Sequence, residues 1–246
     1  MWGIDGGCGL GKLVLIGGGG HCKSVLDSAL AMKTFEEIVI TDAGLAAGKE
    51  VFGCRVAGTD KELYGLAKKG FGYAFITVGS IKSAKLRKQL SAVAMSFGFR
   101  FPVICDPTAC VSPFAVIGEG TFIGKNVVVN AEARVGRHCI INTGSILEHE
   151  CTIGDYSHIS VGSILCGNCH VGRESFIGAG STVIQEVSVG DHTVVGAGSR
   201  VLANVGDDMK VYGVIGKCKS VSKQGGGGNL TSVCMLFFWG PYPGVA

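Results

Sequence analysis

The chain has 246 residues, a length that fits two modest domains or a single large one. The net charge is +3 and there is no long basic or acidic run, which removes the electrostatic case for nucleic acid or an anionic membrane as a partner. The longest apolar run near the C-terminus has seven residues, far below the ~20 of a membrane-spanning helix. Eleven cysteines without an export signal favour reduced thiols, so we expect a cytoplasmic protein.

The first hundred residues predict strands that alternate with helices. Residues 1–11 are expected to form a flexible extension, and strands are expected at 13–16, 38–41 and 73–78. Helical spacing follows the first strand, Thr59 opens a capping box, and a basic helix is expected at about 81–96. This order predicts a small parallel sheet covered by helices, an α/β domain over residues 12–104.

Three features fall at the carboxyl ends of these strands, where parallel sheets bind ligands: the glycine loop 17–20, Asp42 and Gly79. A glycine loop before a helix lets a phosphate approach the backbone, although such a turn is also often only structural. The dinucleotide pattern Gly-x-Gly-x-x-Gly fails, because Cys22 stands at its third glycine. We therefore expect a nucleotide-like ligand without NAD chemistry. The following basic cluster is expected on a solvated helix face, with a diphosphate contact as the alternative: Lys82, Lys85, Arg87 and Lys88.

A strict six-residue repeat fills the second half of the chain. Starting at Val111, sixteen consecutive positions spaced six apart are aliphatic, the last being Val201. The residue four places after each aliphatic is small. Neither an α-helix nor a flat sheet has this period, and a hexapeptide β-helix does, with three hexads in each 18-residue coil. We expect this domain over residues 105–217, followed by an unassigned glycine-rich linker and apolar tail over 218–246.

The stretch "LCGNCHV" at 165–171 contains Cys-x-x-Cys-His, a pattern typical of covalent haem attachment and suggestive of zinc. The six-residue register argues against both. Cys169 takes a small inward position, stacked one coil beyond Cys151, whereas Cys166 lies at the turn. The two thiols therefore do not share an accessible face, and we expect no metal and no haem.

Glu148-His149-Glu150 carries the strongest candidate for chemistry. Leu147 and Cys151 take the inward positions, so His149 must lie on the outer surface. An imidazole titrates near neutrality and serves as a general base when a carboxylate orients it, but spacing alone fits an exposed turn histidine equally well. His158 is a second candidate, and two further histidines are expected at the surface, namely His138 and His192.

Four stretches carry a resemblance over roughly residues 12–217: "LVLIGGGGHCKSVLDSA", "FPVICDPTACVSP", "INTGSILEHECTIGDYSHISVG" and "VYGVIGK". The chain resembles the sialic acid O-acetyltransferases and bacillosamine-pathway N-acetyltransferases, which are hexapeptide-repeat sugar acyltransferases of surface polysaccharide or glycan biosynthesis. The resemblance implies a Rossmann-like domain before a left-handed β-helix. It also implies transfer from acetyl-CoA to a sugar amine or hydroxyl, often on a nucleotide-linked sugar, at sites between the subunits of a homotrimer.

The resemblance also assigns residues. It implies that His149 deprotonates the attacking group, that Glu150 polarises His149, and that Asn142 belongs to the active site. Positions expected to meet the cofactor are His158, Gly167, Ala179 and Ala197. Positions expected to bind the nucleotide sugar are Gly19, Gly20, His21, Asp42 and Gly79. Because Gly167 follows His149 by 18 residues, it should stack beside the base and leave room for an acetyl group.

The chain departs from the family's sequence pattern at three places, and two functions other than acetyl transfer stay open. The family usually has glycine at Cys22, often "HP" at Asp106-Pro107, and G-x-P-A-K where this chain has "GVIGK". The first alternative is a non-catalytic trimeric scaffold that binds a nucleotide sugar, which would leave Glu148-His149-Glu150 idle. The second is a γ-type carbonic anhydrase, whose zinc needs a third histidine beside His149 and His158 that the spacing does not supply.

Overall fold

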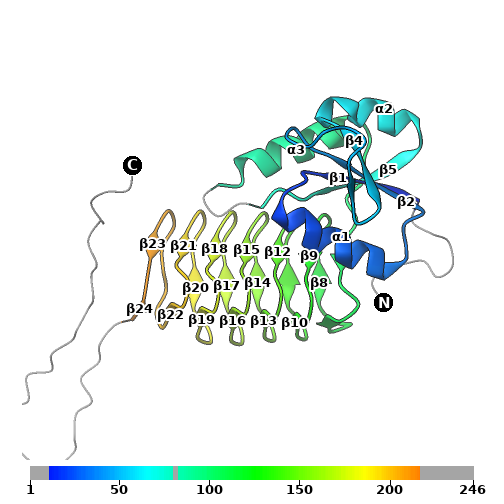
Figure 1. Ribbon diagram of the computed structural model, residues 1–246. Helices are drawn as coiled ribbons and strands as arrows, with labels where there is room; N and C mark the ends of the chain where they lie inside the picture. Colours follow the sequence, from blue (N-terminus) through cyan, green and yellow to red (C-terminus); the bar gives the residue numbers. More distant parts are fainter. Residues whose placement is uncertain (1–10, 80–82, 217–246) are drawn as a thin grey trace, which may run out of the picture.

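The computed structural model describes residues 11–79 and 83–216, so residues 1–10 of the predicted N-terminal extension and the whole glycine-rich tail lie outside it. An α/β domain sits against the first coils of a long prism of stacked short strands (Figure 1). The two-domain order predicted from the sequence is therefore present.

The α/β domain is a five-stranded sheet in the order β3-β4-β2-β1-β5. All neighbours are parallel except β3 and β4, which form an antiparallel hairpin at one edge. The hairpin turn at Phe52 and Gly53 has two positive φ angles of 48° and 79°, the type I′ geometry that suits twisted strands. The elements are β1 Lys12–Ile16, α1 Gly20–Met32, β2 Glu37–Thr41, β3 Glu50–Val51, β4 Cys54–Gly58, the 3₁₀ turn η1 Asp60–Glu62, α2 Leu63–Lys68, β5 Phe71–Ile76 and α3 Lys85–Ser96.

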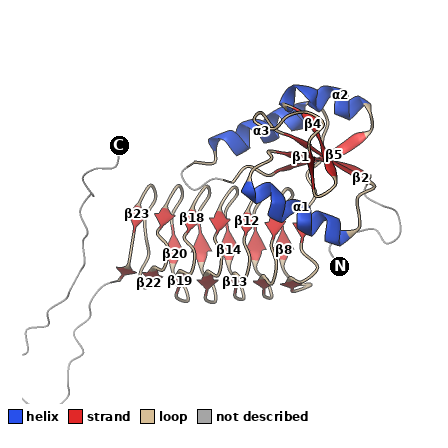
Figure 2. Ribbon diagram, viewed as in Figure 1, coloured by secondary structure: helices blue, strands red, loops and turns tan. Residues whose placement is uncertain are grey.

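The helices cover the two sides of this sheet (Figure 2). On one side α1 packs with its Val25 and Leu26 against the sheet, and this cluster continues into Ile104, Phe122 and Ile140 of the β-helix. On the other side α2 and α3 bury Leu66 and Ala94. The capping box is only partly as predicted, because the Thr59 hydroxyl accepts from the amide of Lys61 at 3.4 Å.

The prism consists of two-residue strands in three parallel sheets, here called the first, second and third faces. The first face is β6-β9-β12-β15-β18-β21-β23, the second is β7-β10-β13-β16-β19-β22-β24, and the third is β8-β11-β14-β17-β20. The strands are β6 Ile104–Cys105, β7 Cys110–Val111, β8 Val116–Ile117, β9 Phe122–Ile123, β10 Val128–Val129, β11 Arg134–Val135, β12 Ile140–Ile141, β13 Ile146–Leu147, β14 Thr152–Ile153, β15 His158–Ile159, β16 Ile164–Leu165, β17 His170–Val171, β18 Phe176–Ile177, β19 Thr182–Val183, β20 Ser188–Val189, β21 Val194–Val195, β22 Arg200–Val201, β23 Lys210–Val211 and β24 Val214–Ile215.

The 18-residue coil predicted from the repeat is confirmed by the strand register. Ile140 pairs with His158, and Leu147 pairs with Leu165 one coil on. The aliphatic residues of the repeat form one continuous buried core. Small inward residues are also buried, and their hydroxyls donate to corner carbonyls of the next coil, as Ser157 does to Gly172 at 2.6 Å and Ser163 to Gly178 at 2.9 Å. These bonds satisfy polar atoms that would otherwise be costly to bury.

The corners of the prism are sharp because one residue in each takes a left-handed backbone. Between the first and second faces this residue is Gly144, with φ of 67°, and the same position is glycine in the next three coils. Between the second and third faces it is Glu150, with φ of 61°. Strict stacking of these corners places outward side chains from successive coils in columns.

Two clamps join the domains. The buried carboxylate of Asp106 accepts from the Ser28 hydroxyl of α1 at 2.6 Å and lies 3.3 Å from Lys125 Nζ. On the other side Arg87 of α3 donates to the backbone carbonyls of His138 and Tyr156.

Two surface predictions at this second clamp are wrong. Arg87 is 2% exposed and His138 is 4% exposed, because α3 packs on the corner that carries His138. Lys88 does lie on the helix surface and pairs with Glu174 at 2.8 Å. Helix α3 begins at Lys85, and Lys82 lies outside the described residues. His192 is exposed, as predicted.

Candidate active site

The glycine loop after β1 is built around Asp42, which follows β2. The Asp42 carboxylate accepts from the amides of Gly18 at 2.6 Å, Gly44 at 2.7 Å and Leu45 at 2.9 Å. Burial raises the pKa of Asp42, but these three hydrogen bonds outweigh it and lower the pKa. Gly17 has φ of 110°, which favours glycine. Asp42 therefore organises the loop, and its predicted contact with a ligand hydroxyl stays a prediction.

His21 lies in the first turn of α1, directly after Gly19 and Gly20, and faces the β-helix. Its ring meets Phe122 edge-on, with centroids 5.5 Å apart, and a side chain added at Gly79 would contact His21. Burial is the main reason that the pKa of His21 falls to about 3, with further lowering by the charges of His158 and Arg87. His21 is thus neutral at physiological pH, and its buried Nε2 has no hydrogen-bond partner among the described residues.

His158 brings the first face of the β-helix into the same region. It stacks between Ile140 and Phe176 in successive coils, and its ring meets Phe176 edge-on with centroids 5.0 Å apart. The Asn142 Nδ2 lies 3.5 Å from His158 Nε2. Two predicted site residues that are 16 positions apart in the sequence therefore meet in space.

His149 lies on the corner between the second and third faces, with a side chain that is 60% exposed. Its Nδ1 is 3.0 Å from Glu150 Oε2, so the orienting carboxylate is Glu150, which spacing alone left open between Glu148 and Glu150. Gly167 stacks beside His149 as predicted. The expected room for an acetyl group is wrong, because a Cβ added at Gly167 would meet the imidazole Nε2: the ring itself occupies that space.

Ala179 and Ala197 lie on the corner between the first and second faces, the corner that also carries Asn142. Both are exposed, and they stack one coil apart, with the amide of Gly198 donating to the Ala179 carbonyl at 2.8 Å. Strand β13 runs between this corner and the corner of His149. Within one chain, Ala179 and Ala197 therefore lie on a different edge of the prism from the predicted base, whereas Gly167 shares the edge of His149.

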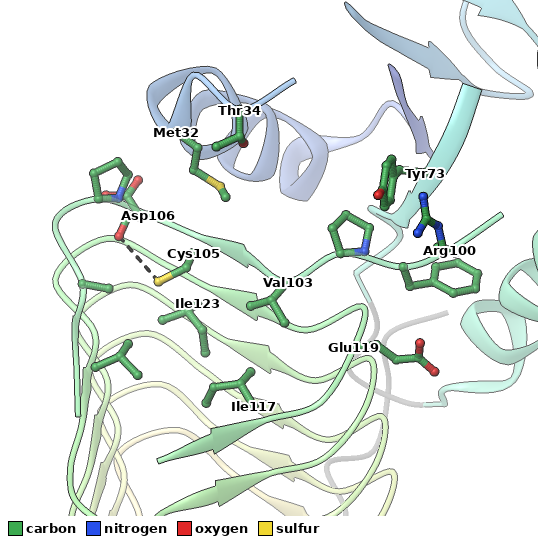
Figure 3. Close-up of a pocket in the computed structure, with 15 residues that line it drawn as sticks. Met32, Thr34, Tyr73, Arg100, Val103, Cys105, Asp106, Ile117, Glu119 and Ile123 are labelled. Atoms are coloured by element: carbon green, nitrogen blue, oxygen red, sulfur yellow. Dashed lines mark hydrogen bonds between the residues drawn. The ribbon is translucent and has the colours of Figure 1, made fainter. Parts of the chain in front are cut away.

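A cavity of about 790 Å³ opens at the mouth of the β-helix, under the end of α1 (Figure 3). Val103, Ile117 and Ile123 form its floor, and Tyr73 and Arg100 form part of its rim. Its lining includes none of the predicted site residues among those described. The Cys105 pKa rises to about 11, mainly through burial, so this thiol is a poor nucleophile.

The Cys-x-x-Cys-His stretch has the register that the repeat predicted. Cys169 and Cys151 are fully buried in adjacent coils and are free thiols, whereas Cys166 is partly buried. Within residues 11–79 and 83–216, no group of three or more His, Cys, Asp or Glu side chains is arranged to hold a metal ion. None of the helices in that part of the chain is long and apolar enough to cross a membrane.

Sequence reasoning missed the residues that join the two halves of the site. Phe122 and Phe176 precede core aliphatics at outward positions, and large apolar residues at such positions were the available signal. The sequence placed Arg87 in a basic cluster but did not indicate that it is buried or that it meets Tyr156, because that contact depends on how α3 packs on a corner of the prism.

Residues 12–93 match the family model of the PglD N-terminal domain, and residues 101–209 match that of the GMPPB C-terminal domain. No curated protein sequence matches the chain. Among solved structures, the acetyltransferase domain of PglB from Neisseria gonorrhoeae, solved also with acetyl coenzyme A, is 35% identical with a TM-score of 0.76, over 82% of this chain and 96% of that one.

PerB from Caulobacter crescentus, solved in complex with CoA and GDP-perosamine, is 35% identical with a TM-score of 0.75, over 84% of this chain and 96% of that one. WeeI from Acinetobacter baumannii has the same fold at 21% identity and a TM-score of 0.71. Identity above 30% across nearly the whole length of the first two relatives establishes kinship. With its Rossmann-like domain and left-handed β-helix, this chain belongs to the hexapeptide-repeat sugar acetyltransferases and is an enzyme of that family.

Proposed function

We propose that this protein transfers the acetyl group of acetyl-CoA to an amino group of a nucleotide-linked sugar, with a hydroxyl as the alternative acceptor. The observation that carries the proposal is the exposed His149–Glu150 pair on a β-helix corner, at 3.0 Å. The relatives support the substrates, because the PglB domain was solved with acetyl coenzyme A and PerB with CoA and GDP-perosamine.

The chemistry follows from the geometry of the pair. Glu150 accepts a hydrogen bond from Nδ1–H of His149, which keeps that proton on Nδ1 and leaves Nε2 as the basic nitrogen. The amine or hydroxyl of the acceptor attacks the thioester carbonyl and gives its proton to Nε2, and a tetrahedral oxyanion forms. Its collapse breaks the carbon–sulfur bond, and the CoA thiolate leaves and is protonated. The Caulobacter enzyme has also been solved with a single histidine replaced by alanine or asparagine, in complex with CoA and GDP-perosamine.

The two substrates approach from different sides. Acetyl-CoA follows the corner column that carries Ala179 and Ala197, with His158 beside it on the first face. The nucleotide part of the acceptor binds at the glycine loop 17–20, where the amide ends of α1 favour a phosphate. The sugar then extends past His21 and Gly79 toward His158, because these groups line the seam between the two domains.

A second copy of the chain completes the site. Asn142 and His149 lie on different edges of the prism, so a substrate that touches both groups must lie between two subunits. The second face offers a partly exposed apolar column that suits such an interface: Val128, Ile146 and Ile164. We propose a homotrimer, since a three-faced prism closes naturally under threefold symmetry. We place the reaction in the cytoplasm, where buried thiols such as Cys151 and Cys169 stay reduced.

The first experiment tests the activity. Purified protein is incubated with acetyl-CoA and a panel of UDP-, GDP- and CMP-linked amino and deoxy sugars, and products are identified by mass spectrometry. One acetyl group gained by a nucleotide-linked amino sugar supports the proposal. If every acceptor stays unmodified while a nucleotide sugar still binds, the protein is a scaffold. Carbon dioxide hydration would indicate the anhydrase.

The second experiment tests the shared site. Variants His149→Ala and Asn142→Ala are each expected to be inactive as homo-oligomers. Co-expressed, they form mixed trimers in which about a quarter of the interfaces carry both native residues, so activity returns to about that level. Absence of any recovery in verified mixed trimers would contradict a site between subunits.

A further inference from the structure

Arg87 is a buried cation at the seam between the domains. It lies on α3 and is 2% exposed, and its partners are two backbone carbonyls of the β-helix. One is that of Tyr156 at 3.2 Å and the other is that of His138. These two residues occupy the same corner in consecutive coils. Among the described residues Arg87 forms no ion pair with a carboxylate, and burial lowers its pKa.

Such an arrangement is a costly way to attach a helix. A buried charge loses its hydration, and two carbonyl hydrogen bonds recover only part of that loss, so a well-packed apolar residue would attach α3 at least as firmly. What the guanidinium adds is geometry. Its rigid fork fits two carbonyls one coil apart, which fixes both the height and the angle at which α3 meets the prism.

That angle bears on the substrate path. Helix α3 packs on β5, and Gly79 lies three residues beyond the end of that strand. Burial is the main cause of the lowered pKa of His21, and the charges of His158 and Arg87 add to it, so the clamp lies within electrostatic reach of the seam where the His21 ring contacts Phe122. A second hydrogen bond joins Ser91 Oγ and the Tyr156 hydroxyl at 2.8 Å and repeats the contact one turn further along α3.

We propose that Arg87 is a positioning residue. By fixing the α/β domain on two coils, it sets the distance and angle between the glycine loop and the first face, and thereby where a nucleotide-held sugar meets the acetyl group. The inference rests on the proposed function. It assigns to Arg87 no contact with either substrate, so its loss should affect an acceptor held by the α/β domain and spare an acceptor that reaches the β-helix alone.

The test is Arg87→Met, which keeps an apolar chain in the seam. With the nucleotide-linked amino sugar we expect kcat to fall on the order of ten- to a hundredfold, as misplacements of about 1 Å do. With the same amino sugar free of its nucleotide, at high concentration, we expect a rate within about twofold of native. Product should be followed by chromatography, because Cys110 is exposed and reacts with thiol reagents.

Lys88→Met is the matched control. Lys88 is the next residue on α3, and its ion pair with Glu174 is at the surface, so both acceptors should behave as with the native protein. If Arg87→Met fails to fold by circular dichroism, Arg87→Lys replaces it, since one ammonium cannot reproduce the fork. Equal effects on both acceptors, or no effect on either, would overturn the inference while leaving the function intact. A native protein that acetylates no nucleotide sugar would instead overturn the function.

Discussion

The β-helix and the α/β domain place their functional residues by different means. In the β-helix each residue stands 18 positions from the one above it, and parallel hydrogen bonds keep that register up to β22. Only the last coil is shorter, since Val194 pairs with Lys210 and Arg200 pairs with Val214. In the α/β domain, loops of different lengths meet at the ends of strands, and their arrangement depends on contacts with the prism. The positions of functional residues in the β-helix can therefore be predicted by counting along the repeat, whereas those in the α/β domain depend on packing.

The difference explains which histidines the sequence could place. His149 and Gly167 are one coil apart, and they stack as counting predicts. His138 is also in a corner of the repeat, yet it is buried, because α3 covers that corner and Tyr156 stacks on its ring with centroids 4.9 Å apart. Counting gives the position of a residue on the prism, but a neighbouring domain decides whether that position meets water.

The largest expected effect tests the counted part. His149→Ala should lower kcat on the order of a hundred- to ten-thousandfold, because it removes the proposed general base. Thermal stability should stay near native, since the side chain is 60% exposed. His170→Ala, an exposed histidine on the third face, is the control and should keep full activity. Activity within tenfold of native in His149→Ala would mean that the base lies elsewhere.

Gly167→Ala adds one methyl group and tests whether His149 stacks on Gly167 as the 18-residue register predicts. Its Cβ would meet His149 Nε2, so the imidazole must turn away, and we expect kcat to fall on the order of tenfold or more. The matched control is Gly206→Ala, since a Cβ at that corner glycine meets nothing within 4 Å. Kinetics of the two variants at saturating acetyl-CoA decide the question. Equal activity would show that the ring is not held where the stack places it.

His138→Phe tests the packed part through pH. Burial, followed by the charges of Arg87 and Arg137, lowers the pKa of His138 from 6.5 to about 4. As the pH falls, the unfolded chain therefore takes up the proton of His138 before the folded chain does. The contribution of neutral His138 to the free energy of unfolding is complete above pH 6.5, and it declines by about 3 kcal/mol as the pH falls toward 4. Phenylalanine keeps the ring contacts and removes the titration, so its loss of stability between pH 7 and pH 4.5 should be smaller.

Urea unfolding at several pH values measures this difference. The control is His192→Phe, at the same corner three coils further on, where the side chain is 52% exposed and little change in pH dependence is expected. Identical pH slopes for His138→Phe and the native protein would show that the His138 ring does not stay neutral and covered by α3.

Asp106→Asn addresses the other clamp and has the smallest expected effect. Burial raises the pKa of Asp106, but bonds from Ser28, Thr108 and Lys125 outweigh it and lower the pKa to about 2. The contribution of the Asp106 carboxylate to the free energy of unfolding is therefore present above pH 3.8 and lost as the pH falls through 2. Asparagine at this position should lower the free energy of unfolding by about 2 kcal/mol at pH 7. Asp27→Asn, whose exposed carboxylate pairs with the same Lys125, should cost much less in urea unfolding. Equal costs would contradict a buried clamp at Asp106.

Much of the fold could be predicted because it follows from periodicity. The coil length, the inward aliphatics and the burial of Cys169 all come from a period that the chain keeps over sixteen aliphatic positions. The short edge strand β3 could not be predicted, since two residues carry no pattern. The site was predictable in part: the columns of His149 and Asn142 follow from the register, whereas the buried surroundings of His21 depend on Phe122, 101 residues away in the chain.

The regular coil also gives the enzyme a built-in unit of length. Ala179 and Ala197 stand one coil apart, at a rise of about 4.8 Å per coil. Excising 18 residues beyond the seam would shorten the track by one such step and leave every remaining side chain facing as before. Excising 17 would rotate all that follows out of phase. Within these regular coils the side-chain columns therefore stay aligned only when whole coils are added or removed. Under the proposed function, the number of coils sets how far acetyl-CoA extends along this edge.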